Sequence, residues 1–178
     1  MRVEDLQSLL DREAIRQLVH AYCRAIDRRD FALLRTLYHP DAMDDHTPYF
    51  CGRAAEFIDQ LPAIMAVNRI TSHQVTNLLV ALDSDCDRAE GEVGILAYHL
   101  MDTPEGPVDF LVGGRYLDHY LRTEGRWQFM RRKIVLDWSD RKPSGFSPDI
   151  ARQHGAVLGA AGPDDPSYGC LSLFPRGV

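Results

Sequence analysis

The feature that most constrains the fold of this chain is a change in hydrophobic spacing near Arg69. Before this residue, apolar side chains recur at three- and four-residue steps, which places them on one face of a helix. After it, β-branched and aromatic runs are separated by short turn signals, as in antiparallel strands joined by hairpins. Helices followed by a long-stranded meander predict an α+β domain, in which a cone-shaped, curved antiparallel sheet packs on about three helices and encloses a cavity.

Three helices are expected before the first long strand. The first spans about residues 3–28, and the second begins after Asp30 as its N-cap and is stopped by Pro40. The polar segment 41–51 is interpreted as a turn. Helical spacing returns over residues 52–67, where Pro62 is expected to weaken or kink the third helix.

Four strands are expected near residues 69–82, 88–102, 108–122 and 126–138. After Trp138 the composition shifts to Gly, Pro, Ala and Ser, which favours loop structure with one helical turn near 149–154. We therefore divide the chain into a cone domain, residues 1–138, and a Gly/Pro-rich extension, residues 139–178. The extension is expected to be a lid over the cone or a subunit contact.

Composition excludes several functions. The 178 residues suffice for one large core, and the net charge of −6 has the wrong sign for a nucleic-acid partner. No apolar run approaches the roughly 18 residues that span a bilayer, and no signal-peptide stretch begins the chain. The scattered cysteines Cys23, Cys51, Cys86 and Cys170 fit free thiols. A soluble, cytoplasmic protein without membrane or nucleic-acid partners is expected.

Asp27 and His73 are the strongest candidates for chemistry. Asp27 ends the first helix, where the macrodipole disfavours an acid, and it lies on the margin of the apolar stripe. His73 shares a strand face with Val75 and Leu79, which is expected to point toward the helices. A carboxylate that orients an imidazole forms a general-base unit. Two structural explanations stay open: Asp27 caps the turn at residues 28–30, or His73 is a core histidine bonded to backbone.

Six segments of the sequence form a recognisable series: Glu13–Leu18, Ala25–Asp27, Phe31–Ala42, Ser72–Asn77, Gly113–Tyr116 and Gly125–Phe129. Together they resemble the SnoaL-like division of the nuclear-transport-factor-two-like superfamily, over about residues 8–138. Within it, the similarity is closest to scytalone dehydratase, bile-acid dehydratase and hexachlorocyclohexane dehydrochlorinase.

The resemblance implies a cone fold, elimination chemistry without cofactor or metal, and a homo-oligomer, with a trimer favoured. It gives His73 the role of general base and Asp27 that of its orienting carboxylate. Tyr22 would serve a carbonyl or hydroxyl of the substrate. Tyr49 is the nearest match to a second tyrosine of the dehydratases, and His99 to a second histidine that contacts the substrate.

Two further groups of residues have open interpretations. Arg115 is either a cavity cation that holds an anionic leaving group or enolate oxygen, or an outward arginine paired with a neighbouring strand. Leu136 stands where the bile-acid enzyme has an arginine, which weighs against that substrate class. One cluster has a metal-like composition and is interpreted as a solvated turn rather than a metal site: His39, Asp41, Asp44, Asp45 and His46.

These observations favour a cofactor-independent lyase or isomerase, most simply a dehydratase-like elimination on a small hydrophobic cyclic, aromatic or polycyclic substrate. The alternative is a non-catalytic module for ligand binding or assembly, similar to the β subunits of aromatic-ring dioxygenases. A fold of this kind carries many chemistries, so the substrate is left open.

Overall fold

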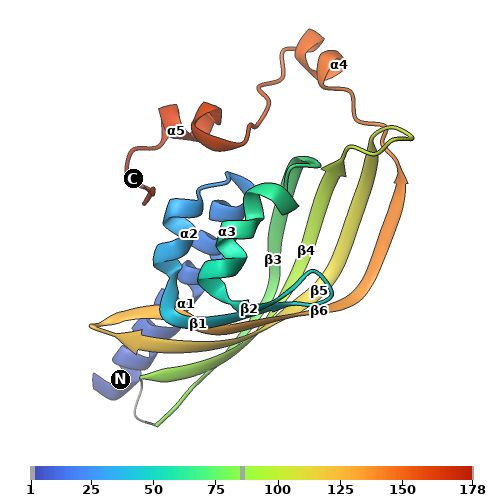
Figure 1. Ribbon diagram of the computed structural model, residues 1–178. Helices are drawn as coiled ribbons and strands as arrows, with labels where there is room; N and C mark the ends of the chain where they lie inside the picture. Colours follow the sequence, from blue (N-terminus) through green and yellow to red (C-terminus); the bar gives the residue numbers. More distant parts are fainter. Residues whose placement is uncertain (1–2, 85–86, 178) are drawn as a thin grey trace.

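The α+β cone is confirmed in the computed structural model, which describes residues 3–84 and 87–177. Three helices lie within the curve of a six-stranded sheet that does not close into a barrel (Figure 1). The helices are α1 (Val3–Asp27), α2 (Phe31–Leu37) and α3 (Ala54–Ile64). The strands are β1 (Tyr38–His46), β2 (Phe50–Arg53), β3 (Asn68–Leu82), β4 (Arg88–Met101), β5 (Val108–Thr123) and β6 (Arg126–Pro143).

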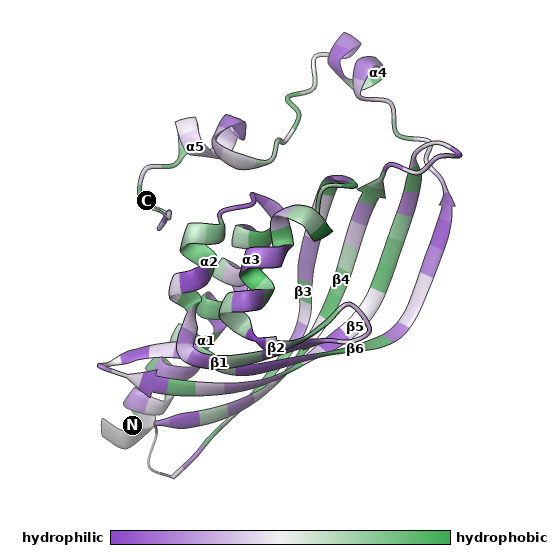
Figure 2. Ribbon diagram, viewed as in Figure 1, coloured by the Kyte–Doolittle hydropathy of each residue, from purple (hydrophilic) through white to green (hydrophobic). Residues whose placement is uncertain are grey.

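The strand order is β2-β1-β6-β5-β4-β3, so the four long strands form the predicted meander. Their ends agree with the sequence prediction to within one residue, except that β6 continues past Trp138 to Pro143. Figure 2 shows hydrophobic and hydrophilic bands alternating along these strands. The Asp30 side chain caps α2 by accepting a hydrogen bond from the Leu33 amide at 2.9 Å, as predicted. The helix ends at Leu37, before Pro40.

The interpretation of residues 41–51 as a turn is wrong, because this segment forms most of β1 and the start of β2. β1 pairs in parallel with β6, so the sheet is mixed rather than wholly antiparallel. The register places Asp44 opposite Arg132 and Asp45 opposite Lys133, and Lys133 Nζ lies 2.8 Å from Asp45 Oδ2. Opposite charges on neighbouring strands stabilise the pairing. Of the two acids that make this segment look like a loop, Asp45 is thus matched by a charge on the partner strand.

The core contains a fully buried ion pair between Arg132 of β6 and Asp118 of β5. Arg132 Nε and Nη2 donate to the two Asp118 oxygens at 2.8 and 2.7 Å. The Tyr120 hydroxyl donates to the same carboxylate at 2.8 Å. Three aromatic rings surround the guanidinium carbon at 3.9–4.2 Å, which stabilises the buried cation. These rings belong to Tyr22, Tyr116 and Phe129.

β6 has a bulge opposite Gly113 and Gly114 of β5: Gly113 pairs with Trp138 and Gly114 with Leu136, so Asp137 is the extra residue. A β-carbon on Gly113 would lie 2.2 Å from the Trp138 indole, and one on Gly114 would lie 2.5 Å from the Val135 carbonyl oxygen. Only glycine fits this close approach of the strands. A bulge bends its strand and increases the local twist, so it contributes to the curvature of the cone.

The extension after β6 crosses the upper end of the cone in Figure 1 and returns to the junction of α1 and α2. The Gly162 amide donates to the Arg28 carbonyl at 2.7 Å, and the Gly177 amide donates to the Asp30 carboxylate at 3.0 Å. Arg28 also pairs with Asp165 at 3.2 Å. The extension contains α4 (Pro148–Gln153), which confirms the predicted helical turn, a 3₁₀ turn (Gly162–Asp164) and α5 (Pro166–Cys170).

The described cysteines form no disulfide. Cys23, Cys51 and Cys170 are free, while Cys86 lies outside the described residues. In the described part of the chain, no helix combines the length and the apolar character that crossing a bilayer requires.

The bulge predicts a large effect of a single methyl group. We expect Gly114→Ala to lower the free energy of unfolding by roughly 1–3 kcal/mol, because the new β-carbon meets backbone rather than a flexible side chain. Gly145→Ala is the control, since no atom lies within 4 Å of the corresponding β-carbon. Urea denaturation of both variants measures the difference, and equal midpoints would contradict the close approach.

Two bidentate Arg–Asp pairs on β5 and β6 allow a matched comparison. Asp118→Asn leaves the buried Arg132 charge without its counterion, and we expect a loss of about 3–5 kcal/mol of stability. Asp137 holds Arg115 through two hydrogen bonds of 2.9 Å, but this pair is exposed, so Asp137→Asn should leave the unfolding midpoint nearly unchanged. Thermal unfolding of the two variants side by side is the measurement.

Candidate active site

Asp27 and His73 are in direct contact at the junction of α1 and β3. Asp27 Oδ1 lies 2.7 Å from His73 Nδ1, and Asp27 Oδ2 accepts the backbone N–H of His73 at 2.8 Å. Both side chains are only 11% exposed. One carboxylate therefore fixes both the strand position and the ring orientation of His73.

These contacts also determine the tautomer of His73. A carboxylate can only accept hydrogen bonds, so the proton of the neutral ring lies on Nδ1. Nε2 then carries the free lone pair, which is the form needed to accept a proton from a substrate. Among the described residues, no side chain or backbone group is hydrogen-bonded to Nε2.

His99 on β4 lies beside the dyad. Its ring meets the ring of His73 edge to face, with centroids 5.5 Å apart, and Phe110 lies on its other side at 6.0 Å. Burial, together with the neighbouring His73, lowers the pKa of His99 from 6.5 to about 4. Its Nδ1 atom is buried and has no hydrogen-bond partner among the described residues. The predicted second histidine is therefore adjacent to His73 and neutral at pH 7.

A cavity of about 370 Å³ lies between α1 and β3 and reaches both members of the dyad. Cys23 also lines it, but burial raises the pKa of this thiol to about 12. A thiol with that pKa stays protonated at neutral pH and is a poor nucleophile. Proton transfer by His73 is therefore the chemistry that the lining of this cavity favours.

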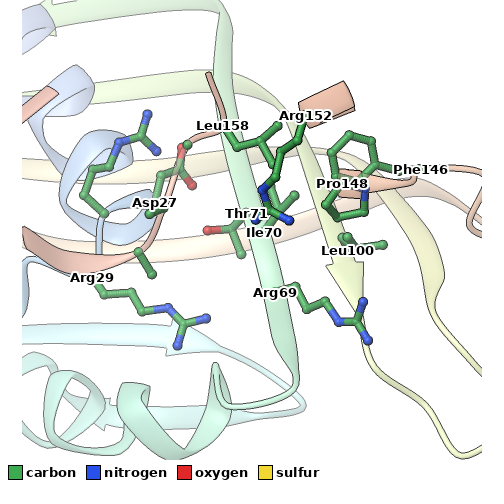
Figure 3. A pocket seen from close by; sticks show the side chains of 14 residues that line it. Asp27, Arg29, Arg69, Ile70, Thr71, Leu100, Phe146, Pro148, Arg152 and Leu158 are labelled. Carbon is green, nitrogen blue, oxygen red and sulfur yellow. The ribbon is translucent and has the colours of Figure 1, made fainter. Parts of the chain in front are cut away.

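A second cavity, of about 240 Å³, lies on the other side of Asp27, beneath the C-terminal extension (Figure 3). Its floor comes from β3 and the end of β4, where Ile70, Thr71 and Leu100 lie. Its opposite wall comes from the extension and includes Phe146 and Leu158. Because Asp27 lines both cavities, a molecule in the second cavity would lie against the carboxylate of the dyad.

Tyr22 lies in the core rather than beside the dyad. It is 2% exposed, and the Arg132 guanidinium lies 4.0 Å from its ring centre. Burial raises the pKa of its hydroxyl well above the ordinary value. Among the described residues, its ring contacts are to Tyr38, Tyr116 and Phe129. The helical spacing indicated that Tyr22 faces inward, but it did not distinguish the core from the cavity.

Tyr49 and Arg115 are not brought to the dyad either. Tyr49 lies in the turn between β1 and β2 with 78% of its surface exposed. Arg115 is next to the buried Tyr116 on β5, so strand alternation places it on the opposite, outer face of the sheet. There it pairs with Asp137 at 2.9 Å and with Glu92 at 3.3 Å. This is the outward, paired arrangement left open as the alternative.

A second carboxylate–imidazole pair was missed because β1 was interpreted as a solvated turn. Asp44 is 1% exposed, accepts a hydrogen bond from the Tyr38 hydroxyl at 2.6 Å and contacts His46 Nδ1. The His46 ring stacks on Phe57 at 4.5 Å. Among the described residues, no group of three His, Cys, Asp or Glu side chains is arranged to hold a metal ion. No local pattern marked this strand, because its partner β6 lies far away in the chain.

Solved structures share this fold over most of their length. The hexachlorocyclohexane dehydrochlorinase LinA-type3 of Novosphingobium barchaimii LL02 is 23% identical, with a TM-score of 0.72 over 81% of this chain and 99% of that one. A protein provisionally described as a scytalone dehydratase, from Novosphingobium aromaticivorans, is 22% identical, with a TM-score of 0.67 over 79% and 97%. Kfla4162 of Kribbella flavida is 23% identical, with a TM-score of 0.68 over 75% and 95%.

At these identities the likeness establishes the fold alone. No curated protein matches the chain. The SnoaL-like domain matches residues 7–133, which include most of α1, the whole of β3 to β5 and most of the core. The chain is therefore a member of the SnoaL-like domain family.

Proposed function

We propose that this protein is a cofactor-independent lyase or isomerase that performs a dehydratase-like elimination on a small hydrophobic cyclic substrate. The observation that carries the proposal is the double contact of Asp27 with His73, at 2.7 Å to the ring and 2.8 Å to the backbone. The two side chains are mostly buried, and the hydrogen bonds between the residues offset part of the cost of their lost hydration. Buried, paired titratable groups of this kind are concentrated at functional sites.

In this mechanism His73 Nε2 removes a proton from a carbon next to a carbonyl or next to the carbon that bears the leaving group. The electrons of the C–H bond form the new double bond, and the leaving group departs with the electrons of its own bond. Where the leaving group is a hydroxyl, the imidazolium returns the proton to its oxygen, so that water leaves. Asp27 stabilises the imidazolium as it forms, because opposite charges attract strongly where water is largely excluded. For an isomerisation, the same imidazolium returns the proton to a different carbon.

His99 contributes a neutral imidazole next to the base. Its low pKa prevents a second positive charge from opposing proton uptake by His73. Its Nδ1 is buried and His99 does not line the cavity beside the dyad, so its contribution is to keep the surroundings of His73 free of a second charge. The non-catalytic alternative has no use for this pair of adjacent histidines.

Removal of the base tests the reaction. We expect His73→Ala to lower kcat/KM by about 100-fold or more, and Asp27→Asn to lower it too, because the ring loses its orienting carboxylate. A panel of hydroxylated aromatic compounds and steroids, followed by mass spectrometry for loss of water, provides the assay. His119→Ala is the control, since that histidine is exposed on β5. Equal turnover by wild type and His73→Ala would eliminate the proposal.

Acidification tests the environment of His99. Its pKa in the native state lies near 4, below the ordinary 6.5, so the unfolded chain takes up a proton between these pH values that the native chain does not. The native state therefore loses stability as the pH falls from 6.5 to 4, by up to about 3 kcal/mol.

The measurement is urea denaturation of wild type and His99→Gln at pH 7 and pH 4.5. We expect wild type to lose more stability than the variant on acidification, because glutamine does not titrate. His119→Gln should lose as much as wild type. An identical loss in His99→Gln and wild type would contradict the low pKa.

A further inference from the structure

We propose that the 240 Å³ cavity beneath the extension binds the carboxylate of a small apolar acid, with Arg29 as its principal partner. This inference goes beyond the proposed function, because Asp27 lines this cavity but His73 does not, so the acid binds next to the dyad rather than as its substrate. It names a ligand class: a monocarboxylate with a compact hydrocarbon body.

The charge of the cavity is the first observation. The protein carries a net charge of −6, yet four arginines line this cavity and Asp27 is the one acidic residue among the lining side chains. Figure 3 shows the Arg152 side chain extending from the extension toward Ile70 and Thr71. Guanidinium groups match carboxylates in geometry and charge. The four are Arg28, Arg29, Arg69 and Arg152.

Arg29 differs from the other three in its partners. Its guanidinium donates to the Asn68 carbonyl, and in the described part of the chain no carboxylate pairs with it. Its positive charge is therefore available to a ligand, although the residue is half-buried. Each of the other arginines pairs with an aspartate: Arg28 with Asp165 at 3.2 Å, Arg69 with Asp102 at 2.9 Å, and Arg152 with Asp149 at 3.1 Å.

The backbone of Arg29 is the second, independent observation. Arg29 has a φ of 54° at the end of α1, in the left-handed region. The Asp30 amide donates to the Ala25 carbonyl at 2.8 Å, and the Arg29 amide to the Ile26 carbonyl at 3.1 Å. These bonds define a Schellman motif, whose left-handed position is usually glycine. A bulky residue in that conformation is strained, and such strain is concentrated at functional sites.

The remaining lining defines the body of the ligand. Ile70, Leu100, Phe146 and Leu158 give the cavity apolar walls. Its volume is below the roughly 300–1,000 Å³ of typical ligand pockets, which favours a compact molecule. Asp27 at the edge would repel a second carboxylate, so a monocarboxylate fits better than a diacid.

The test uses two probes of the same shape, cyclohexanecarboxylate and its neutral amide, cyclohexanecarboxamide. Isothermal titration calorimetry with the full chain should give about tenfold or more tighter binding of the acid, because only the acid forms a charge-assisted pair. Arg29→Gly should abolish this preference while the unfolding temperature stays unchanged or rises, since glycine relieves the strain. Arg29→Asn, which also tolerates the left-handed region, should behave in the same way.

Glu124→Gly is the matched control. Glu124 has a φ of 51° in the exposed β5–β6 turn, so glycine relieves the same strain there without reaching the cavity. This variant should keep the preference for the acid. His73→Ala should keep it as well, which separates this inference from the fate of the proposed reaction. Equal affinity for acid and amide, a preference that survives Arg29→Gly, or no binding of the acid at millimolar concentration would overturn the inference.

Discussion

The buried pair of Arg132 and Asp118 is the interaction on which the rest of the structure depends. Its two hydrogen bonds join β5 and β6, and its aromatic cage includes Tyr22 of α1. A buried guanidinium such as that of Arg132 is stable only while its partners stay in place. Because Tyr22 is one of these partners, α1 has little freedom to slide along the sheet. Asp27 lies further along the same helix. The core pair thereby fixes the end of α1 at which Asp27 reaches His73.

The sequence predicted the elements that carry a regular hydrophobic period and missed the one that does not. The long strands β3 to β6 alternate in character and end in recognisable turns. β1 contains Pro40 and the acidic run Asp44–Asp45, and it pairs in parallel with a strand far away in the chain. On β6, Lys133 pairs with Asp45, and no local pattern of the β1 segment reveals that partner. Strand propensity and hydrophobic periodicity are properties of a segment by itself, whereas β1 forms a strand because it pairs with β6.

In the candidate site too, some residues could be identified from the sequence and others could not. Asp27 and His73 could be identified because each is unusual locally and because the resemblance joins them. Tyr22 was recognised as inward-facing, but the core and the cavity lie on the same side of α1, so periodicity could not choose between them. Arg115 could have been assigned to the outer face from its buried neighbour Tyr116, had that neighbour been used to fix the register. The buried Arg132 gave no local sign, since it sits in the basic run of residues 131–133.

The end of α1 violates local helix physics twice within three residues, and both violations have the same explanation. An acid at a helix C-terminus is disfavoured by the dipole, and an arginine in a left-handed cap is strained. The cost of placing Asp27 at the helix end is offset by its hydrogen bonds with the backbone N–H and the ring Nδ1 of His73. Arg29, by contrast, has no carboxylate partner in the described part of the chain. Natural sequences are locally consistent except where function selects against consistency. Both residues line the cavity beneath the extension, and Asp27 also lines the cavity of the dyad, so the two departures support a functional region that has the dyad on one side of Asp27 and the cationic cavity on the other.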